Sequence, residues 1–239
     1  MKCIKVFLAG LLLAVSISAY ADDASNVLYG KMEEIAQRGN SEAQYHLGMM
    51  LNNGIGVTKN PREAYEWFEK SADAGDPLAA YKVGCYLAGQ FGVIPINLEK
   101  ALKFKLIAAE AGYALAQHDV AIIYFQHKEP DKAIRWWHAA GSQGYFMSLY
   151  NLSVLFKEGK SVPADSMRAY SYFKLAQLSS RGSINSNAQS ALNQLKKTMS
   201  PEELEKAELL VVNWKAQPTL LTNMAADGQK RAKMLVDGG

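Results

Sequence analysis

Small and bulky apolar residues recur at fixed offsets along the middle of the chain. The offsets are counted from four glycines, Gly39, Gly75, Gly112 and Gly144. Offsets of four, eight and twelve residues fall on one face of an α-helix. The residues there are small at offset four, aliphatic at eight and bulky at twelve: Ala43, Ala79, Ala116 and Ser148; Leu47, Val83, Val120 and Leu152; Leu51, Leu87, Tyr124 and Phe156. The pattern predicts a helix after each glycine.

A second helix follows each of these, marked by an alanine with an aromatic residue three positions later. The pairs are Ala64 and Trp67, Ala101 and Phe104, Ala133 and Trp136, and Ala169 and Tyr172. Turn residues separate the two helices: Gly54 and Gly56 end the first helix of the first copy, and Asn60-Pro61 begins its second. A helical hairpin repeated four times buries its apolar face only against its neighbours, which predicts a stacked array.

The flanking segments complete the predicted domain organisation. Residues 22–38 are expected to form an N-terminal capping helix, residues 39–178 the four repeats, and residues 179–216 two C-terminal capping helices. Ser200, Pro201 and Glu203 match the N-cap, N1 and N3 positions of a capping box. The tail, residues 217–239, is left open between helical and disordered.

The first 21 residues differ from the rest of the chain. Lys2 and Lys5 precede an apolar run, and a small-residue site follows at Ala19-Tyr20-Ala21, which is typical of a cleaved secretory signal peptide. The apolar run is shorter than the ~20 residues of a membrane-spanning helix. We expect cleavage after Ala21, a periplasmic mature protein and no integral membrane segment after cleavage.

Charge and cysteine content exclude some classes of partner and site. Without Lys2 and Lys5 the formal net charge falls from +3 to +1, so no nucleic-acid partner is expected. The mature chain would keep one cysteine, Cys85, which excludes a thiolate zinc site. The histidines show no metal-ligand spacing, and we expect neither a metal site nor a cofactor.

The residues AQYHLGMMLNNGIGVTKNPREAYEWFEKSADAG resemble the Sel1-like repeat, a relative of the tetratricopeptide repeat. The resemblance extends from Gly39 to about Ala176 in four units, the third with a shortened turn near Pro130. It implies an all-α fold, a right-handed α/α superhelical solenoid of helical hairpins. It also implies a concave face lined mainly by the first helix of each pair, and the exported bacterial branch of the family.

The residues expected on the concave face are the candidate partner-binding site. Offset six gives three tyrosines and a histidine, offset ten continues that side, and two residues lie near its far end: Tyr45, Tyr81, His118 and Tyr150; Met49, Cys85, Ile122 and Val154; Phe125 and Lys157. Tyrosine and apolar side chains suit protein binding, because aromatic rings offer large contact area with a polar handle. Packing within the repeat is the alternative role for this column.

The sequence favours a non-catalytic adaptor that binds a protein of unknown identity. The resemblance also suggests an immunity protein that neutralises a secreted antibacterial effector such as a phospholipase. A β-lactam-binding or cell-wall-related enzyme is the distant alternative. Its one motif is Ser171-x-x-Lys174, which is common by chance and whose Tyr172 already has a packing role. No catalytic residues are predicted.

Overall fold

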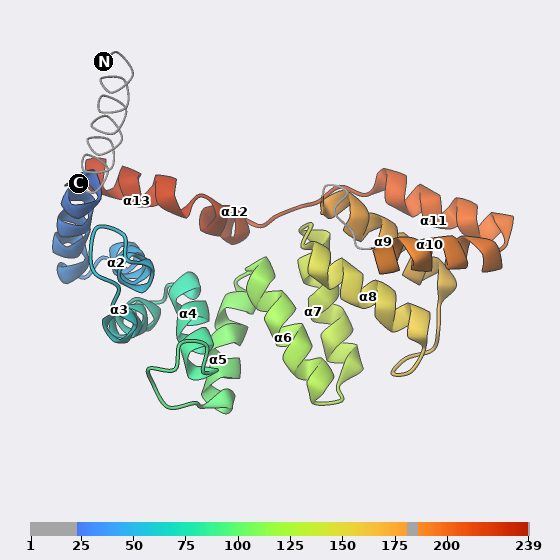
Figure 1. Ribbon diagram of the computed structural model, residues 1–239, viewed down its shortest axis with the longest axis horizontal. Helices are drawn as coiled ribbons and strands as arrows, with labels where there is room; N and C mark the ends of the chain where they lie inside the picture. The colour runs from blue at the N-terminus through green and yellow to red at the C-terminus, as the bar shows by residue number, and fades with distance from the viewer. Residues whose placement is uncertain (1–22, 181–185, 239) are drawn as a thin grey trace, which may run out of the picture. The chain divides into compact units, whose positions relative to one another are not determined.

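The computed structural model describes residues 23–180 and 186–238, and every regular element within them is an α-helix (Figure 1). The predicted signal peptide at residues 1–21 and its cleavage site lie outside the described residues. Consecutive helices pack as hairpins, α2 (Ser41–Asn53) on α3 (Pro61–Asp73), α6 (Ala114–Gln126) on α7 (Pro130–Ser142), and α8 (Phe146–Glu158) on α9 (Ser166–Ser179). The fold is therefore the predicted all-α superhelical repeat class.

The described chain divides into two compact units. Unit 1 runs to Ala101 and takes up the chain again from Asp227, and unit 2 comprises Leu102–Ala226. Unit 1 holds a helix over residues 23–37, α2, α3, α4 (Pro77–Leu87), the first turn of α5 (Leu98–Glu110) and α13 (Gly228–Asp237). Unit 2 holds the rest of α5, α6 to α9, α10 (Ser186–Thr198), α11 (Pro201–Asn213) and α12 (Leu220–Ala226).

Helix starts in unit 1 are fixed by local side chains. The carboxamide of Asn40 accepts a hydrogen bond from the Ala43 N–H at 2.9 Å, and Asp76 does the same for Ala79 at 2.9 Å. These contacts satisfy N–H groups that have no partner within the helix. In unit 2, α6 and α8 follow Tyr113 and Tyr145, whose side chains make no capping hydrogen bond to the helix. The beginnings of these two helices therefore depend on other residues.

A buried ring fills the centre of most hairpins. Phe68, Trp137 and Phe173 are 0%, 4% and 2% exposed. Each lies one residue after the aromatic residue that the sequence pattern marks, and those marked residues, Trp67, Phe104, Trp136 and Tyr172, are only half-buried. A helix advances about 100° per residue, so a shift of one position moves a side chain from the flank of the apolar face to its centre.

The second repeat carries a charged residue at this central position. Lys105 is 9% exposed, and its Nζ lies 2.6 Å from Oδ2 of Asp119 on α6. A buried ammonium is tolerated because a carboxylate compensates it. An ion pair thus occupies the place that a ring fills elsewhere.

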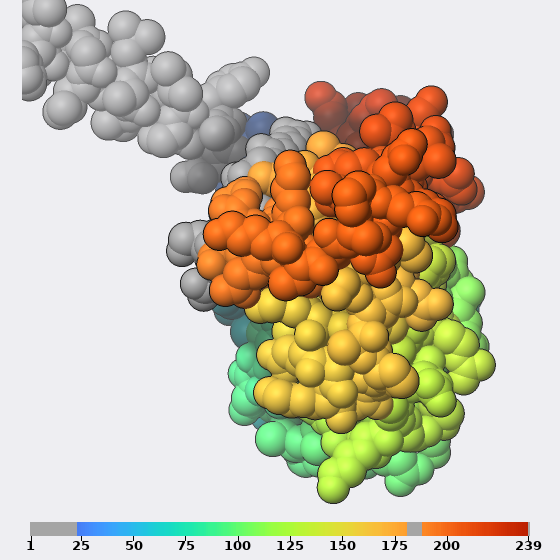
Figure 2. Space-filling view, turned by 90° about the vertical axis from the view of Figure 1, so that its right-hand side faces the viewer, coloured from blue at the N-terminus to red at the C-terminus, as the bar shows by residue number. Residues whose placement is uncertain are grey.

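The C-terminal helices cover the last repeat of unit 2. Ser200 and Glu203 form the predicted capping box, with the Glu203 N–H donating to the Ser200 hydroxyl and the Ser200 N–H to the Glu203 carboxylate. Figure 2 shows α10 and α11 (orange) lying over the surface of α8 and α9 (yellow). Leu192 and Leu195 of α10 and Ala207 of α11 join the core of Phe156 and Phe173.

The tail contains α12 and α13, so helices are present in the segment for which the sequence allowed helix or disorder. Within unit 1, α13 packs on α2, and Nη2 of Arg231 lies 2.6 Å from Oε1 of Glu42. Among the described residues, no helix combines the length and apolar character that crossing a bilayer requires.

The contact between Gly48 and Phe68 gives a stability test. A Cβ added to Gly48 would lie 2.8 Å from two ring atoms of Phe68, whereas one added to Gly30 meets nothing within 4 Å. We expect Gly48→Ala to destabilise unit 1 by about 1–3 kcal/mol through overpacking. Gly30→Ala should stabilise it by up to about 1 kcal/mol through helix propensity.

Denaturant unfolding followed by circular dichroism measures both variants. Equal effects of the two substitutions would contradict the packing of α2 against α3.

Candidate functional site

The ten predicted partner-binding residues are divided between the two units. Tyr45, Met49, Tyr81 and Cys85 belong to unit 1, and His118, Ile122, Phe125, Tyr150, Val154 and Lys157 to unit 2. Tyr45, Tyr81, Cys85 and His118 are 8%, 7%, 5% and 6% exposed. Met49, Ile122, Tyr150 and Val154 are half-buried, and Phe125 and Lys157 are exposed.

The buried members take part in packing. The Tyr45 ring lies 6.0 Å from that of Phe68 and 5.2 Å from that of His46. His118 Nδ1 lies 2.8 Å from the Ser148 hydroxyl on α8, and its ring is 4.9 Å from that of Tyr145. Burial lowers the pKa of His118, although Asp119 opposes this. At these positions the side chains hold neighbouring helices together.

Four of the other members meet in one groove of unit 2. Ile122 and Phe125 of α6 and Tyr150 and Val154 of α8 line a hollow of about 470 Å³. These residues come from the first helices of consecutive repeats, so their spacing in the sequence brings them together. Phe125 is 39% exposed and is the most accessible large apolar side chain of the four. The repeat pattern therefore identified four lining residues of an open apolar groove.

Trp137 of α7 also lines this groove, and sequence reasoning missed it. Its ring centroid is 5.4 Å from that of Phe125, and its buried indole Nε1–H has no acceptor among the described residues. The signal available in the sequence was the pair Trp136-Trp137, of which the repeat pattern marks only Trp136. The rim is polar, formed by Gln126, Asn151, Glu158, Lys160 and Ser161.

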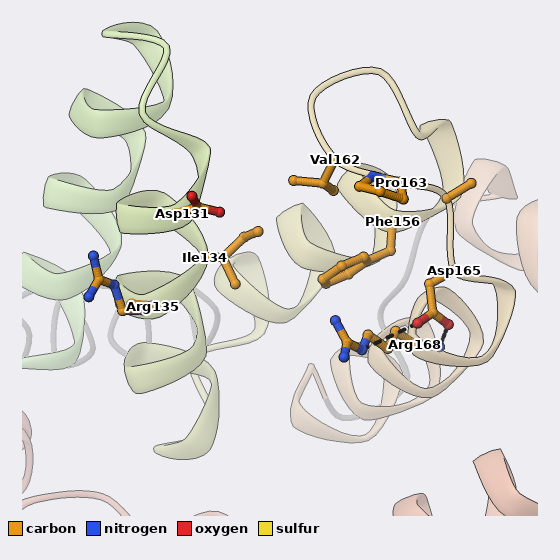
Figure 3. A pocket seen from close by; sticks show the side chains of 9 residues that line it. Asp131, Ile134, Arg135, Phe156, Val162, Pro163, Asp165 and Arg168 are labelled. Atoms are coloured by element: carbon orange, nitrogen blue, oxygen red, sulfur yellow. Dashed lines mark hydrogen bonds and ion pairs between the residues drawn. The ribbon is translucent and has the colours of Figure 1, made fainter.

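A second hollow of about 530 Å³ lies between α7 and the α8–α9 connection (Figure 3). Two of its polar groups, Asp165 and Arg168, already serve the fold. Asp165 caps α9 through the Arg168 N–H at 2.9 Å, and the Arg168 Nε lies 3.3 Å from the other carboxylate oxygen. In Figure 3, Ile134 points toward Phe156 across the hollow while Arg135 points away. We therefore take the groove along α6 and α8 as the candidate site.

The Ser171-x-x-Lys174 motif lies on α9, away from this groove. Ser171 is 5% exposed, and its hydroxyl donates a hydrogen bond to the Met167 carbonyl at 2.9 Å. A nucleophilic serine needs an adjacent base and access to substrate. The geometry of Ser171 is that of a helix residue bonded to its preceding turn.

Comparison with known proteins identifies the family. The Sel1 repeat model matches residues 41–76, 77–113, 114–145 and 147–176, more than half of the chain. The chain belongs to the Sel1 repeat family, whose fold is typically that of a non-catalytic adaptor.

Individual relatives agree with this fold. The chain is 32% identical over 132 residues to chitin synthase regulatory factor 2 of Schizosaccharomyces pombe, covering 52% of this chain and 26% of that protein. A Sel1 repeat protein from Oxalobacter formigenes is 24% identical with a TM-score of 0.61, and the alignment covers 77% of each chain. An immunity protein from Pseudomonas aeruginosa is 20% identical over 86% of this chain and 74% of that one. Its TM-score is 0.43.

The buried histidines give a pH test. Burial lowers the pKa of both His46 and His118 below the ordinary value of 6.5. The unfolded chain therefore takes up protons more readily than the folded one, and stability should fall as the pH drops below 6.5. Part of this loss should disappear in His118→Gln, because this variant lacks one of the two buried imidazoles.

Thermal melting between pH 7.5 and pH 5 provides the measurement. If His118→Gln shows the same pH dependence as the wild type, the pKa of His118 is not lowered in the folded protein.

Proposed function

We propose that the protein binds a protein partner through the groove of Ile122, Phe125, Trp137, Tyr150 and Val154. Sel1 repeats bind protein partners. The observation that carries the proposal is the convergence of these side chains from three helices into one open hollow. An apolar centre with a polar rim is the composition of protein interfaces.

The groove suits an apolar side chain presented by a helix or an extended segment. Phe125 and Trp137 provide ring faces against which such a side chain can pack. Aromatic anchors in a hollow shielded by polar neighbours are the usual hot spots of binding. Glu158 and Lys160 at the rim lie 3.2 Å apart and neutralise one another, so the groove has no strong preference for a charged partner.

A photoreactive phenylalanine analogue placed at position 125 or 209 tests the location of binding. Leu209 on α11 is 60% exposed and serves as the matched apolar control outside the groove. Irradiation in the native cell should link a protein to position 125 but not to position 209. Equal labelling would contradict the groove.

The captured protein is then purified and its affinity measured. Removal of an anchor ring typically costs about 1–3 kcal/mol, so Phe125→Ala should weaken binding by roughly 5- to 150-fold. Leu209→Ala should bind as the wild type does. Unchanged affinity in Phe125→Ala would place the interface elsewhere.

The identity of the partner separates the finer roles. The chain spans only 26% of the length of the yeast regulatory factor, so that protein's activity is a guide to the kind of role and not to the target. Cross-linking of an envelope protein to position 125 would support the adaptor role. Cross-linking of a secreted antibacterial effector would support the immunity role. We propose the adaptor role, because it requires only the general protein-binding character of the repeat.

We further propose that the protein acts in the periplasm, on the strength of the leader-like sequence at residues 1–21. N-terminal sequencing of the protein from fractionated cells should give Asp22 as the first residue, in the periplasmic fraction. Recovery of the chain with residues 1–21 intact in the cytoplasmic fraction would contradict this.

A further inference from the structure

The tail of unit 2 docks on the turns that precede α6 and α8. The Gln217 N–H donates to the Ser142 carbonyl at 2.9 Å, and the side chains of Thr219 and Thr222 contact the turn at Gly112. In Figure 1 this segment (red) passes over the ends of α6 and α7. More than 100 residues separate Thr222 from Ala114, so the contact is a tertiary docking of one segment on another.

The docked segment supplies a helix cap that the local sequence lacks. The Ala114 N–H at the start of α6 donates to the Thr222 hydroxyl at 3.0 Å. In α2 and α4 the side chain immediately before the helix, Asn40 or Asp76, accepts from the N–H of the third helical residue, whereas Thr222 accepts from the N–H of the first residue of α6. Tyr113 offers no such group. The Thr222 hydroxyl thus satisfies one of the N–H groups at the start of α6 that have no partner within the helix.

Two buried glutamines shape the receiving site. Gln143, 9% exposed, donates through Nε2 to the Gly112 carbonyl and to the Gln117 Oε1, both at 2.9 Å. These two bonds orient the Gln143 carboxamide. Its Oε1 accepts hydrogen bonds from the Thr219 N–H at 3.0 Å and from the Thr222 hydroxyl at 2.6 Å. The Thr219 hydroxyl donates to the Gly112 carbonyl at 2.9 Å. We call Gly112, Ala114, Gln117 and Gln143 the polar cradle.

The chemistry of the cradle selects hydroxyl residues. One atom of Thr222 accepts from the Ala114 N–H and donates to Gln143, and the Thr219 hydroxyl accepts from the Thr222 N–H at 3.2 Å while donating to Gly112. Among uncharged aliphatic side chains only serine and threonine combine both functions in one atom. Gly112 has φ +95°, which disfavours other residues, and an added Cβ would lie in tight contact with Thr219 Cγ2 at 3.0 Å.

Little apolar surface reinforces this docking. No residue of α12 is buried, and Leu220 is 76% exposed. A net hydrogen bond contributes only about 0.5–1.5 kcal/mol, and a seven-residue helix is not stable alone. The tail is thus held mainly by a few polar contacts, so a competing segment can replace it.

We propose that the polar cradle is a second peptide-binding site, distinct from the apolar groove and occupied in cis by residues 217–222. In trans it takes a segment of another protein that begins a helix with hydroxyl residues three positions apart, Ser/Thr-x-x-Ser/Thr. The tail competes with that segment, so binding in trans is suppressed until the tail leaves.

A labelled peptide with the sequence of residues 215–226 tests the site by fluorescence anisotropy on the full chain. The tethered tail competes at an effective concentration on the order of millimolar. Full-length protein with Thr219→Val and Thr222→Val should bind this peptide at least about tenfold more tightly than the wild type does. Hydrogen exchange at residues 217–226 should rise in the same variant. Thr198→Val, at an exposed position of α10, should resemble the wild type in both measurements.

A peptide with valine at both hydroxyl positions should not bind any of these proteins. Adding Gln143→Leu to the double variant should abolish binding of the threonine peptide, with circular dichroism confirming the helical fold. The proposal is overturned by unchanged tail exchange in the double variant, by equal binding to wild type and variant, or by equal binding of the two peptides. Variants of Phe125 should leave peptide binding and hydrogen exchange of the tail unaltered. A negative result for the polar cradle is therefore independent of a negative result for the apolar groove.

Discussion

The structure depends on the close approach of paired helices, where a small residue on one faces a bulky side chain on the other. Gly48 leaves less than a methyl group of space beside the Phe68 ring, and Gly141 does the same beside Leu149. Protein interiors are packed at the density of organic crystals, so these contacts fix how neighbouring helices meet. Each hairpin buries its apolar face only against such neighbours.

Polar contacts stabilise the array at positions that depart from this small-against-bulky packing. Lys105 occupies the position of a buried ring and is compensated by Asp119. In unit 2 the tail supplies hydrogen-bond partners to a helix start that lacks its own cap. In unit 1 the tail ends in α13, which an ion pair between Arg231 and Glu42 joins to α2. The same C-terminal segment thus completes both units through polar groups.

The groove and the polar cradle are built from the same repeated helices. Gln117 lies near the start of α6 and Phe125 near its end, so the two sites occupy different turns of one helix. The groove offers an apolar surface with aromatic rings, and the polar cradle offers hydrogen-bond donors and acceptors to hydroxyl side chains. A repeat array can carry such different sites because the stacking positions and the outward-facing positions alternate along each helix.

The sequence alone determined the helices, the four repeats and four of the residues that line the groove, because periodicity reports which residues share a helical face. It also determined the capping box at Ser200, since that contact is local. It did not show which ring is central in each hairpin, because a one-position rotation depends on how two helices meet. Only the tertiary structure decided that Tyr45, Tyr81, Cys85 and His118 are buried and that Trp137 lines the groove. The docking of Thr222 beside Ala114 was equally inaccessible, because no local pattern links residues so far apart in the chain.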